Sequence, residues 1–357
     1  MTDIMKILEE RSKEIDKIIE KYIPKKYDFS SLEFTLGKPR YKYSTEAPNK
    51  AIADPIWNLL NRGGKRWRPT LYMLVCEALG GSSKENLDFV VILESIHNGT
   101  LMIDDIEDSS ELRRGKPCIH KIFGDDIAIN AGNAMYYLPL LSLMKNNIDD
   151  KTKVKAYEIY TQEMINISFG QGMDIAWHKG IANADTVSEA EYLQMVAYKT
   201  GTLSRMAAKL GALFAGSDEP TIEKLGLLGE SIGVGFQIQD DILNLTAISD
   251  KNQFVKDYIG SDITEGKRTL MIIHSLANAS ESDKTKLISI LNEHTTDKEK
   301  INEAIEILKK YDSIDYAKQK AKKILEDAWN ETSPLLAKGQ AKDSLKSLVY
   351  FGVDREY

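Results

Sequence analysis

The chain has 357 residues, of which 42% are hydrophobic and 28% are charged, and its formal net charge is −7. A chain of this size can bury a large core without disulfides, and its two cysteines, Cys76 and Cys118, have no Cys or His partner at zinc-ligand spacing. The chain has no basic block, its N-terminus has no apolar core of signal-peptide length, and no run of 18 apolar residues occurs. We therefore expect a cytoplasmic protein with no membrane span and no nucleic-acid partner.

The first segment with a clear pattern is residues 3–23, where apolar side chains recur at helical spacing until Pro24. We expect a helix that packs on the core or on a partner subunit, because a membrane-surface helix would need a more basic polar face. Residues 24–50 are polar and proline-containing, and we expect them to be irregular. The N-terminal helix and irregular lead-in would then occupy residues 1–50, and a single all-α domain would occupy residues 51–357.

From residue 51 onward, one helical pattern follows another, with breaks rich in glycine and proline. The expected helices cover residues 51–61, 67–79, 84–107, 126–145, 151–178, 189–215, 219–246, 263–276, 283–293, 298–309, 313–332 and 340–349. No stretch shows the sustained alternation of a strand, so the sequence predicts an all-α fold without a sheet of consequence.

The segment Ile103–Gly115 reads I-D-D-I-E-D-S-S-E-L-R-R-G. On a helix, Asp104 and Asp108 would present their carboxylates on one face, about one turn apart. Two like charges at that distance favour a cation between them, and Mg²⁺ prefers oxygen ligands shared with substrate phosphates. Arg113 and Arg114 follow, and arginine suits phosphate oxygens. The pattern indicates a phosphorylated substrate held through metal.

A second acidic pair, Asp240 and Asp241, lies in F-Q-I-Q-D-D, with Gln237 one turn before Asp240. Both this pair and the first one follow apolar runs, so their carboxylates need compensation on an otherwise buried helix face. Two other acidic pairs are expected at helix N-termini, where the helix dipole favours acids: Asp125-Asp126 and Asp149-Asp150.

Basic residues also cluster, beginning with G-G-K-R-W-R-P at residues 63–69. Its cations lie at an expected helix start, where backbone N–H groups help to bind an anion: Lys65, Arg66 and Arg68. His97 lies two turns before Asp104 and is expected to face the same cavity. Further polar residues inside or between apolar segments are Gln171, Asp174, Lys199-Thr200-Gly201, Lys256, Asp262 and Lys267.

Taken in order, these motifs resemble the trans-isoprenyl diphosphate synthase family from about residue 63 to residue 269. They are G-G-K-R-W-R-P, H with D-D-I-E-D and R-R-G, K-T-G, F-Q-I-Q-D-D and G-K-R-T. The resemblance implies the isoprenoid synthase type of fold, a barrel of long antiparallel helices around a deep central cavity. It implies a homodimer, or a higher oligomer. The implied reaction is the Mg²⁺-dependent, head-to-tail condensation of isopentenyl diphosphate with dimethylallyl, geranyl or farnesyl diphosphate.

The resemblance also assigns roles to individual residues. The implied ligands of three Mg²⁺ ions are Asp104 and Asp108 for two ions and Asp240 for the third. Residues that would support these ligands are Asp105, Asp241, Gln171 and Asp174. Side chains that would contact the allylic diphosphate are Arg113, Lys199, Lys256 and Lys267. Side chains that would contact isopentenyl diphosphate are Lys65, Arg68, His97 and Arg114. Dipoles expected near the developing carbocation are those of Thr200, Gln237 and the Lys199 carbonyl.

The ionisation step of this reaction can be understood from electrostatics. Breaking the allylic carbon–oxygen bond leaves a diphosphate anion and an allylic cation, and metal ions with lysine and arginine stabilise the anion. No side chain is an evident base for the proton that is lost, so the released diphosphate is our candidate. Two further positions concern the family pattern: Asn244 stands where many members have a third Asp and is expected to accept or bridge through water, and Tyr350 to Arg355 resemble the closing tail.

Product length is expected to depend on the helix beneath Asp104. The positions four and five residues earlier, Thr100 and Gly99, are small, so no aromatic blocks the tunnel at the fifteen-carbon level. The following turns offer Ile92, Leu93 and Ile96, and a facing helix offers Met135, Tyr136 and Tyr137. We therefore expect a twenty-carbon product, geranylgeranyl diphosphate.

Several alternatives remain open at this point. The product could be farnesyl or a longer-chain diphosphate. A class I terpene cyclase ionises the same substrate, but it would not need the basic residues Lys65, Arg68 and His97. A non-catalytic regulatory subunit would be expected to lose one aspartate pair, and this chain keeps both.

Overall fold

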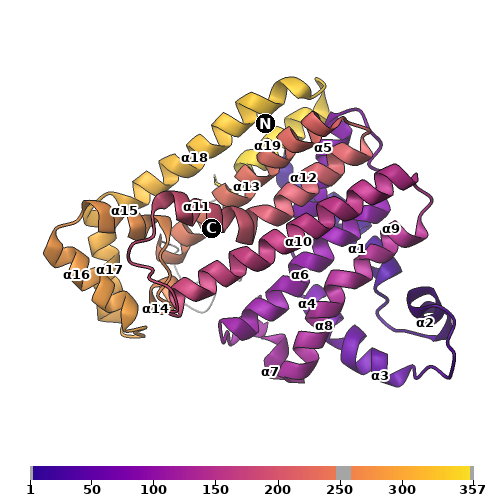
Figure 1. The fold of residues 1–357 in the computed structure, drawn as a ribbon, viewed down its shortest axis with the longest axis horizontal. Coiled ribbons are helices and arrows are strands. Elements are labelled where there is room, and N and C mark those ends of the chain that lie inside the picture. Colours follow the sequence, from indigo (N-terminus) through magenta and orange to yellow (C-terminus); the bar gives the residue numbers. More distant parts are fainter. Residues whose placement is uncertain (1–2, 247–258, 354–357) are drawn as a thin grey trace.

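The computed structural model describes residues 3–246 and 259–353. Within these ranges the fold is all-α, as predicted (Figure 1). The exception is a short antiparallel hairpin of β1 (Leu112–Arg113) and β2 (Lys116–Pro117), in which Arg113 pairs with Lys116. No helix of the described segments is both long and apolar enough to cross a lipid bilayer.

The elements before Gly124 include α6, which carries the first acidic motif. They are α1 (Ile4–Tyr22), α2 (Phe29–Leu36), α3 (Glu46–Pro48), the π-helix η1 (Asn49–Ala53), α4 (Asp54–Leu60), α5 (Trp67–Ala78), the 3-10 helix η2 (Leu87–Phe89), α6 (Val90–Glu107) and α7 (Ile119–Phe123).

The elements from Asp125 to Thr246 include the two longest helices described. They are α8 (Asp125–Tyr137), the 3-10 helix η3 (Leu138–Leu140), α9 (Leu141–Lys145), α10 (Asp150–His178), α11 (Glu189–Val196), the π-helix η4 (Ala197–Gly201), α12 (Thr202–Phe214) and α13 (Glu219–Thr246).

The remaining elements form the end of the molecule farthest from α2 and the cover that returns over α5 (Figure 1). They are α14 (Ser261–Thr264), α15 (Leu270–Asn278), α16 (Glu281–Asn292), α17 (Lys298–Lys310), α18 (Ser313–Thr332), the 3-10 helix η5 (Ser333–Leu335) and α19 (Gln340–Phe351).

Two expectations for the first half of the chain were wrong. Residues 24–50 are not irregular throughout, because Asp28 and Ser31 form a capping box that starts α2. The helix expected over residues 126–145 is broken, because Pro139 lies in the 3-10 turn η3 between α8 and α9. In contrast, the acidic pairs at 125–126 and 149–150 do lie at the N-termini of α8 and α10, where Asp149 caps the Thr152 N–H.

Two more expected helices are divided in the region of the second acidic motif. The segment 189–215 contains the π-helix η4, and the segment 263–276 is interrupted between α14 and α15 around Gly266, which has a φ of 72°. Apolar spacing continues through the π-helix and could not reveal it, whereas the second break falls in the polar run at residues 264–269.

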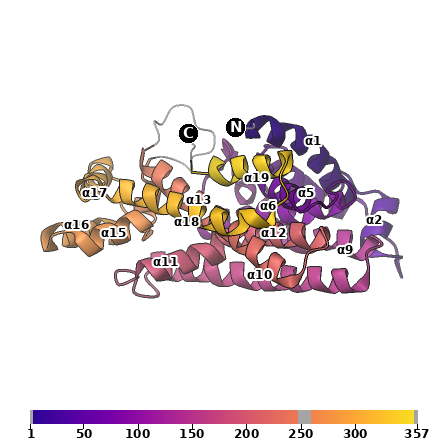
Figure 2. The same cartoon turned by 90° about the horizontal axis from the view of Figure 1, so that it is seen from above.

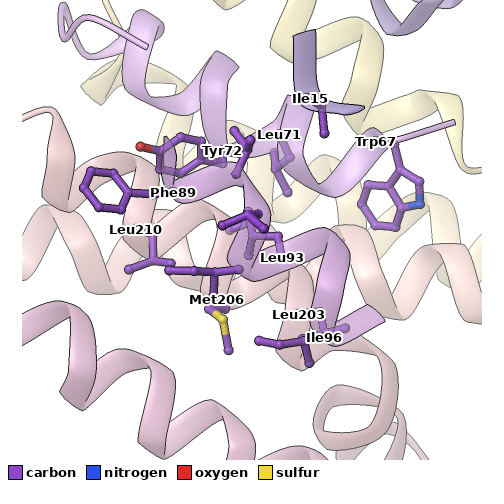
Figure 3. Close-up of a cluster of buried hydrophobic side chains, with 14 of the residues drawn as sticks. Ile15, Trp67, Leu71, Tyr72, Phe89, Leu93, Ile96, Leu203, Met206 and Leu210 are labelled. Carbon is purple, nitrogen blue, oxygen red and sulfur yellow. The ribbon is translucent and has the colours of Figure 1, made fainter. Parts of the chain in front are cut away.

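The core is centred on α5, α6 and α12. Leu71 and Tyr72 of α5 meet Leu93 and Ile96 of α6 and the side chains of α12 (Figure 3). These side chains are almost inaccessible to solvent. Seen from above, α10 and α11 lie on one side of the molecule and α1 and α19 on the opposite side (Figure 2).

Candidate active site

The first acidic motif occupies the last turn of α6. Asp108 is the C-cap residue, and its N–H donates to the carbonyl of Asp104 at 2.9 Å. The Asp105 side chain is only 1% exposed and accepts from Arg113 (Nε–Oδ1 2.8 Å). Burial works to lower the pKa of Arg113, but Asp105 outweighs it and raises that pKa above its ordinary value. Asp105 therefore orients Arg113.

The motif contains a fourth acidic residue, Glu107, to which the sequence pattern assigned no role. The amide of Gln171 on α10 donates to Glu107 (Nε2–Oε2 2.7 Å) and to Asp104 (Nε2–Oδ1 3.2 Å). Burial, and then the nearby Asp104 and Asp108, raise the pKa of Glu107. Glu107 lies three residues after Asp104, and residues at that spacing are neighbours on a helix surface. The spacing could therefore have indicated that Glu107 belongs to this motif.

The π-helix η4 brings a lysine to the same carboxylates. Lys199 forms an ion pair with Asp174 of α10, and its Nζ lies 3.8 Å from Asp104. The neighbouring Thr200 donates its hydroxyl hydrogen to Gln237 of α13 (Oγ1–Oε1 2.9 Å). A Cβ at Gly170 would lie 2.3 Å from the Lys199 nitrogen, so only glycine lets α10 and η4 approach this closely. The K-T-G segment thus joins α6, α10 and α13.

The second acidic motif lies in the last two turns of α13. Asp241 is buried and accepts from the Tyr192 hydroxyl at 2.8 Å and from the Gln237 amide at 2.8 Å. Burial, and then the charge of Asp262, raise the pKa of Asp241 to about 7. The adjacent Asp240 is only partly buried. The pair therefore has one anchored and one more accessible carboxylate.

Lys267, in the turn between α14 and α15, joins the first motif to the acidic residues of its own segment. Its Nζ lies 4.0 Å from Asp108 of the first motif and 3.5 Å from Asp262, and it also pairs with Glu265. The two acidic motifs, distant in sequence, are thus linked in two ways. Lys199 reaches Asp104 while its neighbour Thr200 reaches Gln237 of the second motif, and Lys267 lies near Asp108 while its charge and that of Asp262 act on Asp241. The expected contribution of Lys256 lies outside the described residues.

Asn244 has a different position from the one expected. Instead of extending the metal site, its buried amide donates to Ser261 (Nδ2–Oγ 2.7 Å) and accepts from the Asp262 N–H at 3.2 Å. An amide can do both at once, whereas an ionised Asp could only accept. Asn244 thus holds the segment that carries Lys267 against α13.

A second cluster, which is cationic, lies at the start of α5. Arg68 is buried beside the ring of Trp67, and burial lowers its pKa to about 10. Arg114 donates to the Gly63 carbonyl, and burial lowers its pKa to about 10. Burial, and then Arg68 and Arg114, lower the pKa of His97 well below its ordinary value. The cluster joins segments of α5, α6 and the hairpin, and a bound anion would offset its charge.

Neighbouring residues hold this cluster in place. Arg62, unremarked in the sequence, donates to the carbonyl of Arg113 at 2.9 Å and to Asn58 at 2.6 Å, and so it fixes the hairpin to α4. The Lys65 ammonium lies 4.9 Å from the ring centroid of Phe351, at the end of α19. The sequence placed Arg66 among the anion-binding cations, but in the structure its guanidinium forms ion pairs with carboxylates.

The environment of Gly99 differs from the one expected. A Cβ there would lie 2.8 Å from the Gly132 carbonyl oxygen and 3.0 Å from Met135 Cβ and Tyr136 Cε1, so Gly99 is where α6 packs directly on α8. Its small size is needed for helix packing, and it faces no open space. Thr100 is partly buried, and its hydroxyl donates to the His97 carbonyl at 2.8 Å. Toward the N-terminus of α6, Leu93 and Ile96 are packed in the hydrophobic core (Figure 3).

The residues of the acidic motifs fit a hard divalent cation. Their donors are carboxylate oxygens, which hard divalent cations prefer. Within the described residues, no three His, Cys, Asp or Glu side chains converge into a complete metal site. Mg²⁺ commonly binds through one or two carboxylates plus waters and substrate phosphates, so this donor set suits it.

The sequence and fold match proteins of one family. The family model described as polyprenyl synthetase matches residues 49–308. The short chain isoprenyl diphosphate synthase of Methanothermobacter thermautotrophicus is 34% identical over 300 residues, which cover 84% of this chain and 89% of that protein. The geranylgeranyl diphosphate synthase of Saccharolobus solfataricus is 33% identical over 319 residues, which cover 88% and 94%.

Solved structures with a similar fold agree with the sequence matches. The crystal structure of geranylgeranyl pyrophosphate synthetase from Pyrococcus horikoshii superimposes with a TM-score of 0.84 at 34% identity, and the match covers 99% of both chains. The enzyme from Geoglobus acetivorans superimposes with a TM-score of 0.81 at 28% identity, over 98% of this chain and 100% of that one.

Proposed function

Because the chain belongs to the polyprenyl synthetase family, and is therefore a prenyltransferase, we propose that it condenses isopentenyl diphosphate with allylic diphosphates to form geranylgeranyl diphosphate. The observation that carries this proposal is the presence of two separate anion sites. One is the meeting of the two acidic motifs around Lys199 and Lys267, and the other is the cationic cluster of Arg68, His97 and Arg114.

The first site suits the allylic diphosphate. Its proposed metal ligands are Asp104, Asp108 and Asp240, with three ions when substrate is bound. Mg²⁺, when bound, supplies the positive charge that stabilises the departing diphosphate. The proposed direct contacts to that diphosphate are Arg113, Lys199, Lys256 and Lys267. Residues proposed to support the site are Asp105, Gln171, Asp174 and Asp241, each of which has a bonded partner in the structure.

The second site suits isopentenyl diphosphate. Lys65, Arg68 and Arg114 supply fixed positive charge, and the neutral His97 can donate one hydrogen bond. A terpene cyclase would have no use for this cluster. Thr200 and Gln237 form a chain of hydrogen bonds that ends at Asp241. We propose that their oxygens and the Lys199 carbonyl face the allylic cation, and that the released diphosphate accepts the final proton.

The active unit is proposed to be a homodimer of chains whose residues 51–357 act as one domain, in the cytoplasm. Exposed apolar side chains on α8 and α10 support the choice of a second copy as partner: Tyr137 is 69% exposed and Phe169 is 68% exposed. The two helices meet where the Tyr160 hydroxyl donates to the Tyr136 carbonyl at 2.6 Å. Removing such apolar side chains from water favours association.

The test is direct. Purified chain and Mg²⁺ are incubated with radiolabelled isopentenyl diphosphate and each allylic primer in turn, and the products are sized after dephosphorylation. We expect label in a twenty-carbon alcohol only when both substrates are present. Loss of activity on chelation and recovery with Mg²⁺ would support the metal site. Products formed from farnesyl or geranylgeranyl diphosphate without isopentenyl diphosphate would indicate a cyclase and contradict the proposal.

A further inference from the structure

Next to the proposed isopentenyl diphosphate site lies a network of charged and polar side chains from three helices. Arg66, at the start of α5, is only 4% exposed. Its guanidinium donates to Asp16 of α1 (Nε–Oδ1 2.9 Å) and to Glu94 of α6 (Nη1–Oε1 2.8 Å). Glu94 is 3% exposed and also accepts from the Asn98 amide at 2.7 Å. The network therefore ties α1, α5 and α6 together in the interior.

This network holds the backbone that carries the cationic cluster. Arg66 donates to the Gly63 carbonyl (Nη1–O 3.4 Å) and to the Leu60 carbonyl (Nη2–O 3.3 Å), and Arg114 donates to the same Gly63 carbonyl. Arg66 also has a φ of 48°, in the left-handed region. A residue with a side chain keeps that conformation only where its surroundings hold it there. The position of Arg114 and of the first turn of α5 thus depends on how Arg66 is held.

We infer that Glu94, assisted by Asp16, is a positioning residue for the second diphosphate. It fixes Arg66 and, through the shared Gly63 carbonyl and the start of α5, orients Arg68 and Arg114. This inference rests on the proposed function, which gives the cluster its substrate, and it assigns the N-terminal helix a part in that site.

A competing role for Glu94 predicts the opposite effect of its removal on substrate binding. The charge of Glu94 acts on Arg66, Arg68 and Arg114 alike. If Glu94 were only a negative charge that competes with the diphosphate for these arginines, its removal would tighten substrate binding. If Glu94 positions the cluster, its removal weakens binding, because the arginines are no longer held where the phosphate oxygens need them.

The test measures steady-state kinetics of Glu94→Gln and Asp16→Asn. Isopentenyl diphosphate is varied at saturating farnesyl diphosphate, and then the reverse. We expect the KM for isopentenyl diphosphate to rise about 10- to 100-fold in Glu94→Gln, the size of one or two lost charge-assisted hydrogen bonds. In Asp16→Asn the rise should be smaller, because the Asp16 side chain is 50% exposed. The KM for farnesyl diphosphate and kcat should change little in both.

Two further variants separate positioning from stability. Glu14→Gln changes an exposed carboxylate on the same α1 and should match the unmodified chain. Glu94→Gln leaves the buried Arg66 short of negative charge, which can destabilise the fold. The double variant Arg66→Met with Glu94→Met removes both buried charges, so its Tm should recover. If Glu94 positions the cluster, the KM for isopentenyl diphosphate stays raised in this variant despite the recovered Tm.

The outcomes are distinct. A KM for isopentenyl diphosphate that is unchanged or lower in folded Glu94→Gln overturns the positioning role, and so does a double variant that regains both Tm and KM. If the unmodified chain forms no product that depends on isopentenyl diphosphate, the proposed function itself fails, and the positioning role fails with it.

Discussion

At the scale of single residues, His97 shows how its neighbours decide its chemistry. Burial, and then the charges of Arg68 and Arg114, lower its pKa well below its ordinary value, so the imidazole is neutral near pH 7. A neutral imidazole still has one N–H donor, which suits a phosphate oxygen. In the proposed site, His97 would therefore act through a hydrogen bond, while the arginines would supply the charge.

This assignment makes a prediction for substitutions at His97. Because His97→Gln keeps a neutral donor, its KM for isopentenyl diphosphate should stay within a few-fold of that of the unmodified chain. His97→Ala loses the donor and should raise that KM about tenfold. Profiles of kcat/KM between about pH 6.5 and 8 should have the same shape in His97→Gln and the unmodified chain, because the folded pKa lies below this window. An ionisation near 6.5 that vanishes in His97→Gln would contradict the prediction.

Thr100 is the residue-scale test of product length. It lies one turn before Asp104 on the same face of α6, and it is partly buried. Thr100→Phe should block the space beneath the proposed allylic site and shift the product from twenty to fifteen carbons, as sized by chromatography after dephosphorylation. Thr100→Ser serves as the control. A twenty-carbon product from Thr100→Phe would refute the placement of the growing chain.

Gly99→Phe, the other substitution that the sequence suggests, is a poor test. Its ring would meet the Gly132 carbonyl and Met135 of α8 before it reached any substrate. Loss of activity in that variant would therefore report on helix packing. The chain-length role predicted for Gly99 remains a proposal that this substitution cannot isolate.

At the scale of elements, the π-helix η4 places side chains of the candidate site against several helices. Its wider turn lies between α11 and α12, and it directs Lys199 toward α6 and α10 and Thr200 toward α13. Such π-bulges often occur at functional sites. The close contact with Gly170 of α10 fixes the distance between these helices.

Two glycines of α10 provide a matched pair for testing this element. A Cβ at Gly170 would lie 2.3 Å from the Lys199 nitrogen, whereas a Cβ at Gly172 has nothing within 4 Å. Gly170→Ala should lower stability by about 1–3 kcal/mol and reduce kcat by displacing η4. Gly172→Ala should keep activity and gain up to about 1 kcal/mol from helix propensity. Thermal unfolding and kinetics check both, and equal behaviour of the two variants would contradict the role given to Gly170.

At the scale of the whole molecule, the proposed dimer depends on the apolar faces of α8 and α10. We expect sedimentation at micromolar concentration to show a dimer for the unmodified chain. The double variant Tyr137→Lys with Phe169→Lys should shift it to monomer, because it places charges where apolar surface is buried. Ile181→Lys changes another exposed apolar residue, after α10, and should leave the dimer intact. A monomeric unmodified chain would refute the interface.

Much of the architecture could be predicted because helix formation is local. Apolar spacing revealed most helices, and the four-residue interval placed Asp104 and Asp108 on one face before any fold was known. The capped α2, the break at Pro139 and the π-turn at Lys199 were missed. α2 is started by a cap within a polar segment, and in the other two cases a proline ring or an extra residue changes the backbone while the apolar pattern continues.

The sequence by itself determined which residue types carry the chemistry, since acids, lysines and arginines in these intervals suit metal and diphosphate wherever the helices lie. Only the tertiary structure decided which partner each one takes. It paired Asp105 with Arg113, turned Asn244 to the segment of Lys267, and placed Gly99 against α8. The physical reason is that helical spacing fixes the face on which a side chain lies, whereas the opposite surface comes from packing between segments far apart in the chain.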